Sequence, residues 1–193
     1  MNVTRPRIYL AGKVPKGSEI ATAEDWRSRF MQTLCQFGDF EFLSPEDPTL
    51  DERYPQQIFG HDCYLVRQCD IMIINADSKL GAGTAQEMVI AKHFEKYVLT
   101  VLPRNSHHRR SNLDMHGVIV DDWIHPFLHE TSDRIVSDLD ELERWLQHSC
   151  AELYRTQPKT LNVVDEAIGA YLDSGHGEAA RDHAFSSGTD RIR

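Results

Sequence analysis

The residues best suited to chemistry are a carboxylate and two glycines near the middle of the chain. The stretch Gly81-Ala82-Gly83-Thr84-Ala85-Gln86-Glu87 follows a β-rich apolar run and precedes a segment with helical spacing. A strand, a glycine turn and a helix start would place Glu87 in the first helical turn, where free N–H groups and the helix dipole favour an ionised carboxylate. Such a carboxylate suits a nucleophile, and Gly81 and Gly83 allow a ligand to approach the backbone.

A purely structural interpretation fits the same residues. Thr84-x-x-Glu87 is a capping box, in which the two side chains satisfy each other's backbone donors at a helix N-terminus. The spacing alone therefore leaves a catalytic and a capping role for Glu87 open.

The elements that must position Glu87 alternate between strand and helix patterns. We expect strands over 7–12, 40–43, 71–75, 97–102 and 118–120, and helices over 22–37, 56–69, 84–95, 136–150 and 161–172. This alternation predicts an α/β fold with a doubly wound parallel sheet of about five strands flanked by helices.

Polar side chains gather where ligands bind in such sheets. Asn75 lies just beyond the carboxyl end of the third strand, beside Gly81, at the edge that binds ligands in open parallel sheets. Tyr9 lies on the opposite face of its strand from Ile8 and Leu10, so it is either a core residue or a group aimed at a site at the strand end. Asp70 directly precedes the third strand, where it can also simply close a turn.

Each of two basic segments could either bind a phosphate or simply lie on the solvated surface. Lys13 and Lys16 flank Pro15 in the loop after the first strand. The run His107-His108-Arg109-Arg110 lies in a polar loop, and we interpret it as a solvated surface. The long acidic loop from Ser44 to Pro55 has the length of a functional lid.

Composition narrows the class of protein. The 193 residues are 40% hydrophobic and 26% charged, with a net charge of −9 that argues against a nucleic-acid polymer as partner. No run approaches the ~18 apolar residues of a membrane helix, and no signal peptide is recognisable. The four cysteines form no CxxC pair, which favours thiols in a reducing cytoplasm, and no metal-ligand cluster is visible.

The composition shifts after Pro158. We expect an α/β domain over 1–150 and a helical extension over 151–173. A tail over 174–193 has almost no core-forming residues and is expected to be disordered.

Three motifs together resemble a known enzyme family. Ile8-Tyr9-Leu10-Ala11-Gly12, His61-Asp62 through Cys69-Asp70-Ile71, and Gly81-x-Gly83-x-x-x-Glu87 are similar to the nucleoside 2-deoxyribosyltransferase superfamily, which includes the nucleoside 5′-monophosphate N-glycosidases. The resemblance covers residues 7 to about 120, and weakly to 147. It implies a flavodoxin-like fold, cleavage of the N-glycosidic bond of a small-molecule nucleoside or nucleotide, and no cofactor.

The resemblance also assigns roles by position. Glu87 corresponds to the catalytic carboxylate, Tyr9 to the tyrosine that holds it, and Asp70 to an aspartate that assists at the base or sugar. Met115 lies in a segment that the family takes from the neighbouring subunit, which implies a homodimer or a larger homo-oligomer. The remaining substrate-binding candidates are Gly12, Lys13, His61, Asp62, Asn75, Gly81 and Gly83.

The chain departs from the family at the position of Gly81. The transferases have an aspartate there and the monophosphate glycosidases a serine. The serine and arginine that those glycosidases use after the first strand are replaced by Lys13 and Pro15, so phosphate recognition would pass to Lys13 or Lys16. The alternatives are a non-catalytic nucleotide-binding module and an N-glycohydrolase of the NAD type.

Overall fold

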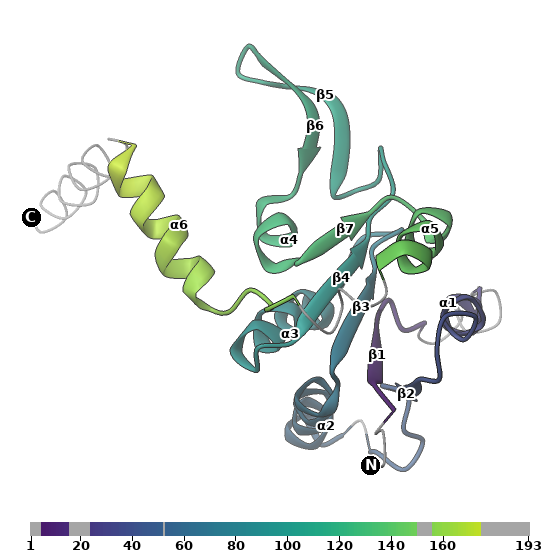
Figure 1. The fold of residues 1–193 in the computed structure, drawn as a ribbon. Helices are drawn as coiled ribbons and strands as arrows, with labels where there is room; N and C mark the ends of the chain where they lie inside the picture. The colour runs from purple at the N-terminus through teal and green to yellow at the C-terminus, as the bar shows by residue number, and fades with distance from the viewer. Residues whose placement is uncertain (1–4, 16–23, 52, 150–155, 175–193) are drawn as a thin grey trace, which may run out of the picture. The chain divides into compact units, whose positions relative to one another are not determined.

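The structure is a computed structural model that describes residues 5–15, 24–51, 53–149 and 156–174 (Figure 1). It divides into two compact units, Met1–Thr160 and Leu161–Arg193, which are described separately.

A five-stranded parallel sheet forms the centre of the first unit. Its strands are β1 (Arg7–Gly12), β2 (Glu41–Leu43), β3 (Ile71–Asn75), β4 (Tyr97–Val101) and β7 (Arg134–Val136). Their order is β2-β1-β3-β4-β7, and every pair is parallel. All residues of β3 and β4 are buried, which explains why both strands read as continuous apolar runs. The predicted parallel sheet is therefore confirmed.

Helices cover both faces of this sheet (Figure 1). The helices α1 (Trp26–Leu34) and α5 (Leu139–Ser149) pack on one face, and α2 (Pro55–Gln68), α3 (Ala82–His93) and α4 (Pro126–Thr131) pack on the other. Ile8 and Leu10 belong to the first core cluster, whereas Tyr9 belongs to the second. Alternation along β1 thus directs the Tyr9 side chain toward α2 and α3.

The strand predicted over 118–120 exists, but its predicted place in the parallel sheet was wrong. Val118 begins β6 (Val118–Ile124), which pairs with β5 (Arg109–Met115) in a separate two-stranded antiparallel sheet. The connecting residues His116 and Gly117 both have positive φ, 56° and 86°, as a two-residue hairpin turn of type I′ requires. The fifth strand of the main sheet is β7, of which only Val136 fell in the predicted helix over 136–150.

The second unit contains one described helix, α6 (Asn162–Asp173). Its apolar side chains Val164, Ile168 and Tyr171 recur at helical spacing and are each about half exposed. Apart from Ser174, the tail predicted over 174–193 lies outside the described residues, and so does the start of the predicted extension at 151–155. Among the described helices, none is long and apolar enough to cross a membrane.

Candidate active site

A cavity of about 860 Å³ opens at the carboxyl ends of β1 and β3. The strand order reverses between these two strands, because the chain moves from β1 outward to β2 on one side and to β3 on the other. In open α/β sheets this point forms a crevice where ligands bind. The volume lies within the ~300–1,000 Å³ typical of small-molecule sites.

The centre of the cavity is a pair formed by Tyr9 and Glu87. The Tyr9 hydroxyl donates a hydrogen bond of 2.7 Å to Glu87 Oε1, and both side chains line the cavity. Tyr9 is 1% exposed and comes from β1, while half-buried Glu87 comes from α3, 78 residues later. The sheet and the helix therefore fix the orientation of this carboxylate from two directions.

The helix start differs from the predicted one. α3 begins at Ala82 after Gly81 as N-cap, with no side-chain capping bond, so Glu87 lies in the second turn and not the first. The capping box is absent because Thr84 lies inside the helix and is not its N-cap, and Glu87 instead accepts the hydrogen bond from Tyr9. An added Cβ at Gly81 or at Gly83 would meet nothing within 4 Å, so these glycines leave open space beside the cavity.

The groups around Glu87 shift the pKa of its carboxyl group in opposing directions. Burial raises the pKa of the Glu87 carboxyl, the Tyr9 hydrogen bond lowers it, and the negative charge of Asp62 raises it. Arg27 adds a smaller lowering effect. The pKa of Glu87 is therefore raised overall, opposite to the effect expected from a helix N-terminus, because desolvation is the largest influence. Burial and the Glu87 charge raise the pKa of Tyr9, so its hydroxyl remains a donor.

Arg27 is a site residue that the sequence analysis missed. It lines the cavity, donates from Nη1 to Glu46 at 3.4 Å, and stacks over the ring of Trp26 at 4.5 Å. Its Nη2 atom is buried without a hydrogen-bond partner. A charged residue beside an apolar helical stripe carries no sequence signal for this position.

Gly12 is needed at the end of β1 because other groups approach it closely. A Cβ there would lie 2.9 Å from the Trp26 ring and 3.1 Å from the Asn75 carbonyl oxygen. The indole nitrogen of Trp26 donates to the Lys13 carbonyl at 3.3 Å. Gly12 therefore allows Trp26 to hold the loop that begins the cavity wall.

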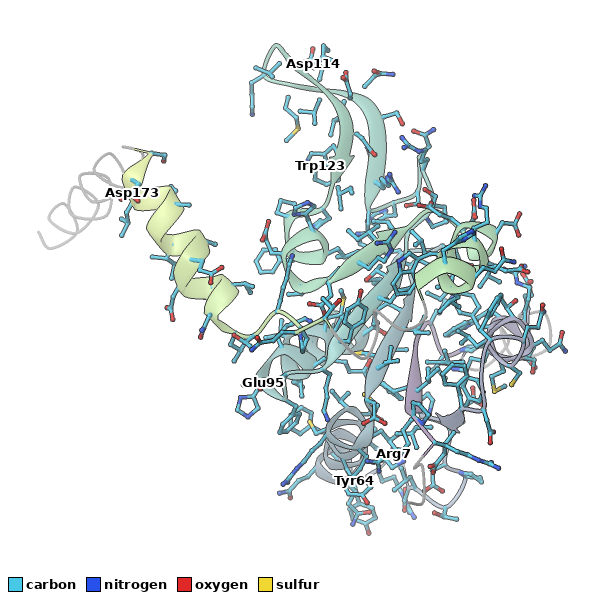
Figure 2. The ribbon with its side chains drawn as sticks, viewed as in Figure 1. Arg7, Tyr64, Glu95, Asp114, Trp123 and Asp173 are labelled. Carbon is cyan, nitrogen blue, oxygen red and sulfur yellow. The ribbon has the colours of Figure 1, made fainter. Side chains whose placement is uncertain are left out.

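Asp70 does not reach the cavity, and its predicted catalytic position was wrong. It precedes β3, so it lies at the amino edge of the sheet, opposite the ligand-binding edge. Its Oδ2 accepts a 2.7 Å hydrogen bond from the backbone N–H of Arg7, which Figure 2 labels at that edge. Asp62, eight residues earlier on α2, does line the cavity together with Glu87.

The other candidates divide into two groups. Those that line the cavity are Gly12, Lys13, His61, Asp62, Gly81 and Gly83. His61 Nδ1 lies 3.3 Å from Asp62 Oδ1 on the same helix. Asn75 is buried under the turn, where its Oδ1 accepts from the Asp77 N–H at 3.3 Å, and Met115 lies exposed on the hairpin. Neither lines the cavity, and Lys16 lies outside the described residues.

The acidic loop between β2 and α2 supplies one wall of the cavity. Its lining residues are Pro45, Glu46, Asp47, Pro48 and Leu50. This placement is consistent with the functional role that the length of the loop suggested. Lys79, on the turn before α3, also lines the cavity and was missed, because a single lysine beside Gly81 is not a motif.

Comparisons with known proteins identify the fold. No protein-family model and no curated protein matches the chain. A solved 2-deoxyribosyltransferase of Bacillus psychrosaccharolyticus is 19% identical, with a TM-score of 0.50, over 80% of this chain and 97% of that one. A 2-deoxyribosyltransferase of Leishmania mexicana is 20% identical, with a TM-score of 0.50, over 74% and 98% of the two chains. The chain has the 2-deoxyribosyltransferase fold.

That finding confirms the resemblance that the motifs indicated, at the level of the fold. A CMP N-glycosidase of Clostridium botulinum is less similar, at 16% identity and a TM-score of 0.42 over 73% of this chain and 98% of that one. Within the described residues, no group of three histidine, cysteine, aspartate or glutamate side chains is placed to hold a metal ion.

Proposed function

We propose that this protein cleaves the N-glycosidic bond of a nucleoside or a nucleoside 5′-monophosphate, by hydrolysis or by transfer of the sugar to a second base. The observation that carries the proposal is the 2.7 Å hydrogen bond between Tyr9 and Glu87 in a cavity at the switch point of the sheet. The solved neighbours with this fold include 2-deoxyribosyltransferases, which supports this class of substrate.

In the proposed mechanism Glu87 acts as the nucleophile. Its carboxylate oxygen forms a bond to C1′ while the C1′–N bond breaks, and the departing base takes that electron pair and a proton from water. The opposite charge of the carboxylate stabilises the oxocarbenium character of C1′ in the transition state. Water then releases the free sugar, or a second base accepts it, and either step restores the Glu87 carboxylate.

The neighbouring side chains have separate roles in this proposal. Tyr9 orients the carboxylate through its hydroxyl, and Arg27 supports the ionised form by its charge. Asp62 replaces Asp70 as the carboxyl group that holds the sugar or the base, since it lines the cavity with Glu87. No step requires a cofactor or a metal ion.

A second copy of the chain is part of the proposal. Met115, Val118 and Ile119 are 42%, 64% and 58% exposed on the β5–β6 hairpin, although all three are large apolar residues. Figure 2 shows Asp114 near the tip of this hairpin and Trp123 nearer its base. The resemblance to the 2-deoxyribosyltransferases implies that the Met115 segment serves the site of a neighbouring subunit, so we assign Met115 to the site of a partner in a homodimer or larger assembly.

A product assay tests the function. The full-length protein is incubated with a panel of ribo- and deoxyribonucleosides, their 5′-monophosphates and NAD, with and without an added free base, and the products are separated by chromatography. We expect base release from at least one nucleoside or monophosphate. Nicotinamide release alone would indicate an NAD glycohydrolase. Tight calorimetric binding without any turnover would replace the proposal by a nucleotide-binding module.

A further inference from the structure

The turn between β3 and α3 carries part of the cavity wall, including Lys79 and Gly81. One of its backbone bonds reaches a side chain far along the chain: the Leu80 N–H donates to His108 Nε2 at 3.0 Å. Leu80 is adjacent to both wall residues and packs partly buried against the second core cluster. A group that fixes Leu80 therefore fixes this wall and the entry into α3.

Hydrogen bonds anchor the chain at His108 and at the residue that follows it. Its carbonyl oxygen accepts a 2.9 Å bond from the His125 N–H. The next residue, Arg109, is buried and binds both carboxylate oxygens of Asp122 at 2.8 and 2.6 Å, and it also donates to the Leu102 carbonyl. The interpretation of the 107–110 run as solvated surface was thus wrong for these two residues. These bonds anchor the base of the hairpin around His108, and the His108 ring itself lies against the rings of His107 and His125.

The hydrogen bond requires a neutral imidazole. Because Nε2 accepts from an N–H, its proton must be on Nδ1, an atom that is buried without a partner. The titratable groups that face the ring are His107, with ring centroids 4.7 Å apart, His125 at 5.7 Å, and Lys79. Burial, followed by the positive charge of these three groups, lowers the pKa of His108 below its usual 6.5. The acceptor is therefore available at neutral pH.

We propose that His108 is a positioning residue, whose neutral ring holds the Leu80 amide and thereby keeps Lys79 and Gly81 against the substrate. The catalytic part of this inference rests on the proposed function. Protonation turns Nε2 into a donor that faces another donor, so the bond is present above the pKa of His108 and is lost as the pH falls through it. The β3–α3 turn is then released from the hairpin base.

Two substitutions separate positioning from general structural support. His108→Ala removes the acceptor, and we expect KM to rise roughly tenfold, the effect of losing one buried hydrogen bond, with a smaller change in kcat. His108→Gln places an amide oxygen at similar reach that does not titrate. It should restore KM, and the loss of kcat/KM on the acid side should move to lower pH than in the wild type.

A nuclear magnetic resonance titration provides a readout independent of activity. In the full-length wild type, the Leu80 amide resonance should follow the titration of the His108 ring, and in His108→Gln it should stay constant. The control is His129→Gln, which changes an exposed histidine on α4 and should leave the Leu80 titration as in the wild type. A Leu80 amide resonance whose chemical shift does not change as His108 is protonated would overturn the inference. A wild-type KM in His108→Ala would also overturn it. If no substrate released base, the proposed function would fail, while the Leu80 titration would still decide whether the contact exists.

Discussion

At the scale of single residues, the proposed chemistry depends on the protonation balance of the Glu87 carboxyl group inside the cavity. Burial favours the protonated form of its carboxyl group, and the Tyr9 hydroxyl opposes that by donating to Oε1 at 2.7 Å. Asp62 adds a like charge, whereas Arg27 adds an opposite one. A nucleophile needs the carboxylate, so activity is expected to fall as the pH decreases through the Glu87 pKa.

Tyr9→Phe should shift that acid limit upward. The substitution removes a hydrogen bond that lowers the Glu87 pKa, while burial and the Asp62 charge continue to raise it. The acid side of the profile of kcat against pH should therefore move to higher pH. Tyr64→Phe is the matched control, because Tyr64 is 59% exposed on α2 and does not line the cavity.

Asp62→Asn should shift the Glu87 pKa in the opposite direction from Tyr9→Phe. Removing its negative charge should lower the Glu87 pKa, which can be followed by carbon-detected magnetic resonance of the Glu87 carboxyl even where activity is lost. A Glu87 titration that moves in the same direction in Asp62→Asn and Tyr9→Phe would contradict the assignment.

At the scale of elements, the strands were predictable where burial is complete. β3 has the expected bounds, Ile71 to Asn75, because all five residues are buried. Four of them are apolar, and the side chain of Asn75 accepts a hydrogen bond. β5 and its pairing with β6 were missed because a ribbon that is solvated on both faces needs little apolar alternation, and the polar residues of β5 are typical of a loop. Asp70 was misplaced for a different reason. Its role was carried over from the family resemblance by position, although a residue before a parallel strand and one after it lie at opposite edges of the sheet.

A buried ion pair joins three elements at the amino edge of the sheet. Asp133 accepts from Lys92 Nζ on α3, from the Val98 N–H at 2.7 Å and from the Lys159 N–H at 2.6 Å. The side chain of Lys92 is fully buried and that of Asp133 is 4% exposed. Burial lowers the pKa of Lys92, and the contact with Asp133 opposes that effect.

Asp133→Ala should lower the free energy of unfolding by about 3–5 kcal/mol, because Lys92 would remain buried without its counter-charge. Urea denaturation measures the change. Asp39→Ala is the control: its ion pair with Arg5 has a similar geometry, at 2.7 Å, but both side chains are more than 60% exposed, so we expect no measurable loss. Equal effects of the two substitutions would contradict the structural role of Asp133.

At the scale of the whole molecule, the sequence located the cavity but not its full lining. The glycine turn, Tyr9 and the acidic loop each carried a recognisable pattern, and all three meet at the switch point of the sheet. Arg27 and Lys79 reach the same cavity only because the fold brings α1 and the β3–α3 turn together. No local spacing encodes that approach.

The exposed hairpin predicts how the chain assembles. Ile119→Asp places a charge among the apolar side chains of Met115 and Val118, so it should convert the assembly to a species of 22.2 kDa in light scattering. Base release should fall with it, because Met115 would no longer reach the site of the partner. Phe59→Asp, at a comparably exposed position on α2, should retain the wild-type mass. A wild-type protein that is already monomeric and fully active would refute the shared site.

The central claim is that the Glu87 carboxylate acts at C1′ of a bound sugar, and the rate of base release by Glu87→Gln tests it most directly. The amide keeps an acceptor for the Tyr9 hydroxyl, so the fold should persist, with a melting temperature close to that of the wild type. The account predicts that the rate on the preferred substrate falls at least roughly 10³-fold. Undiminished base release by this folded variant would contradict it.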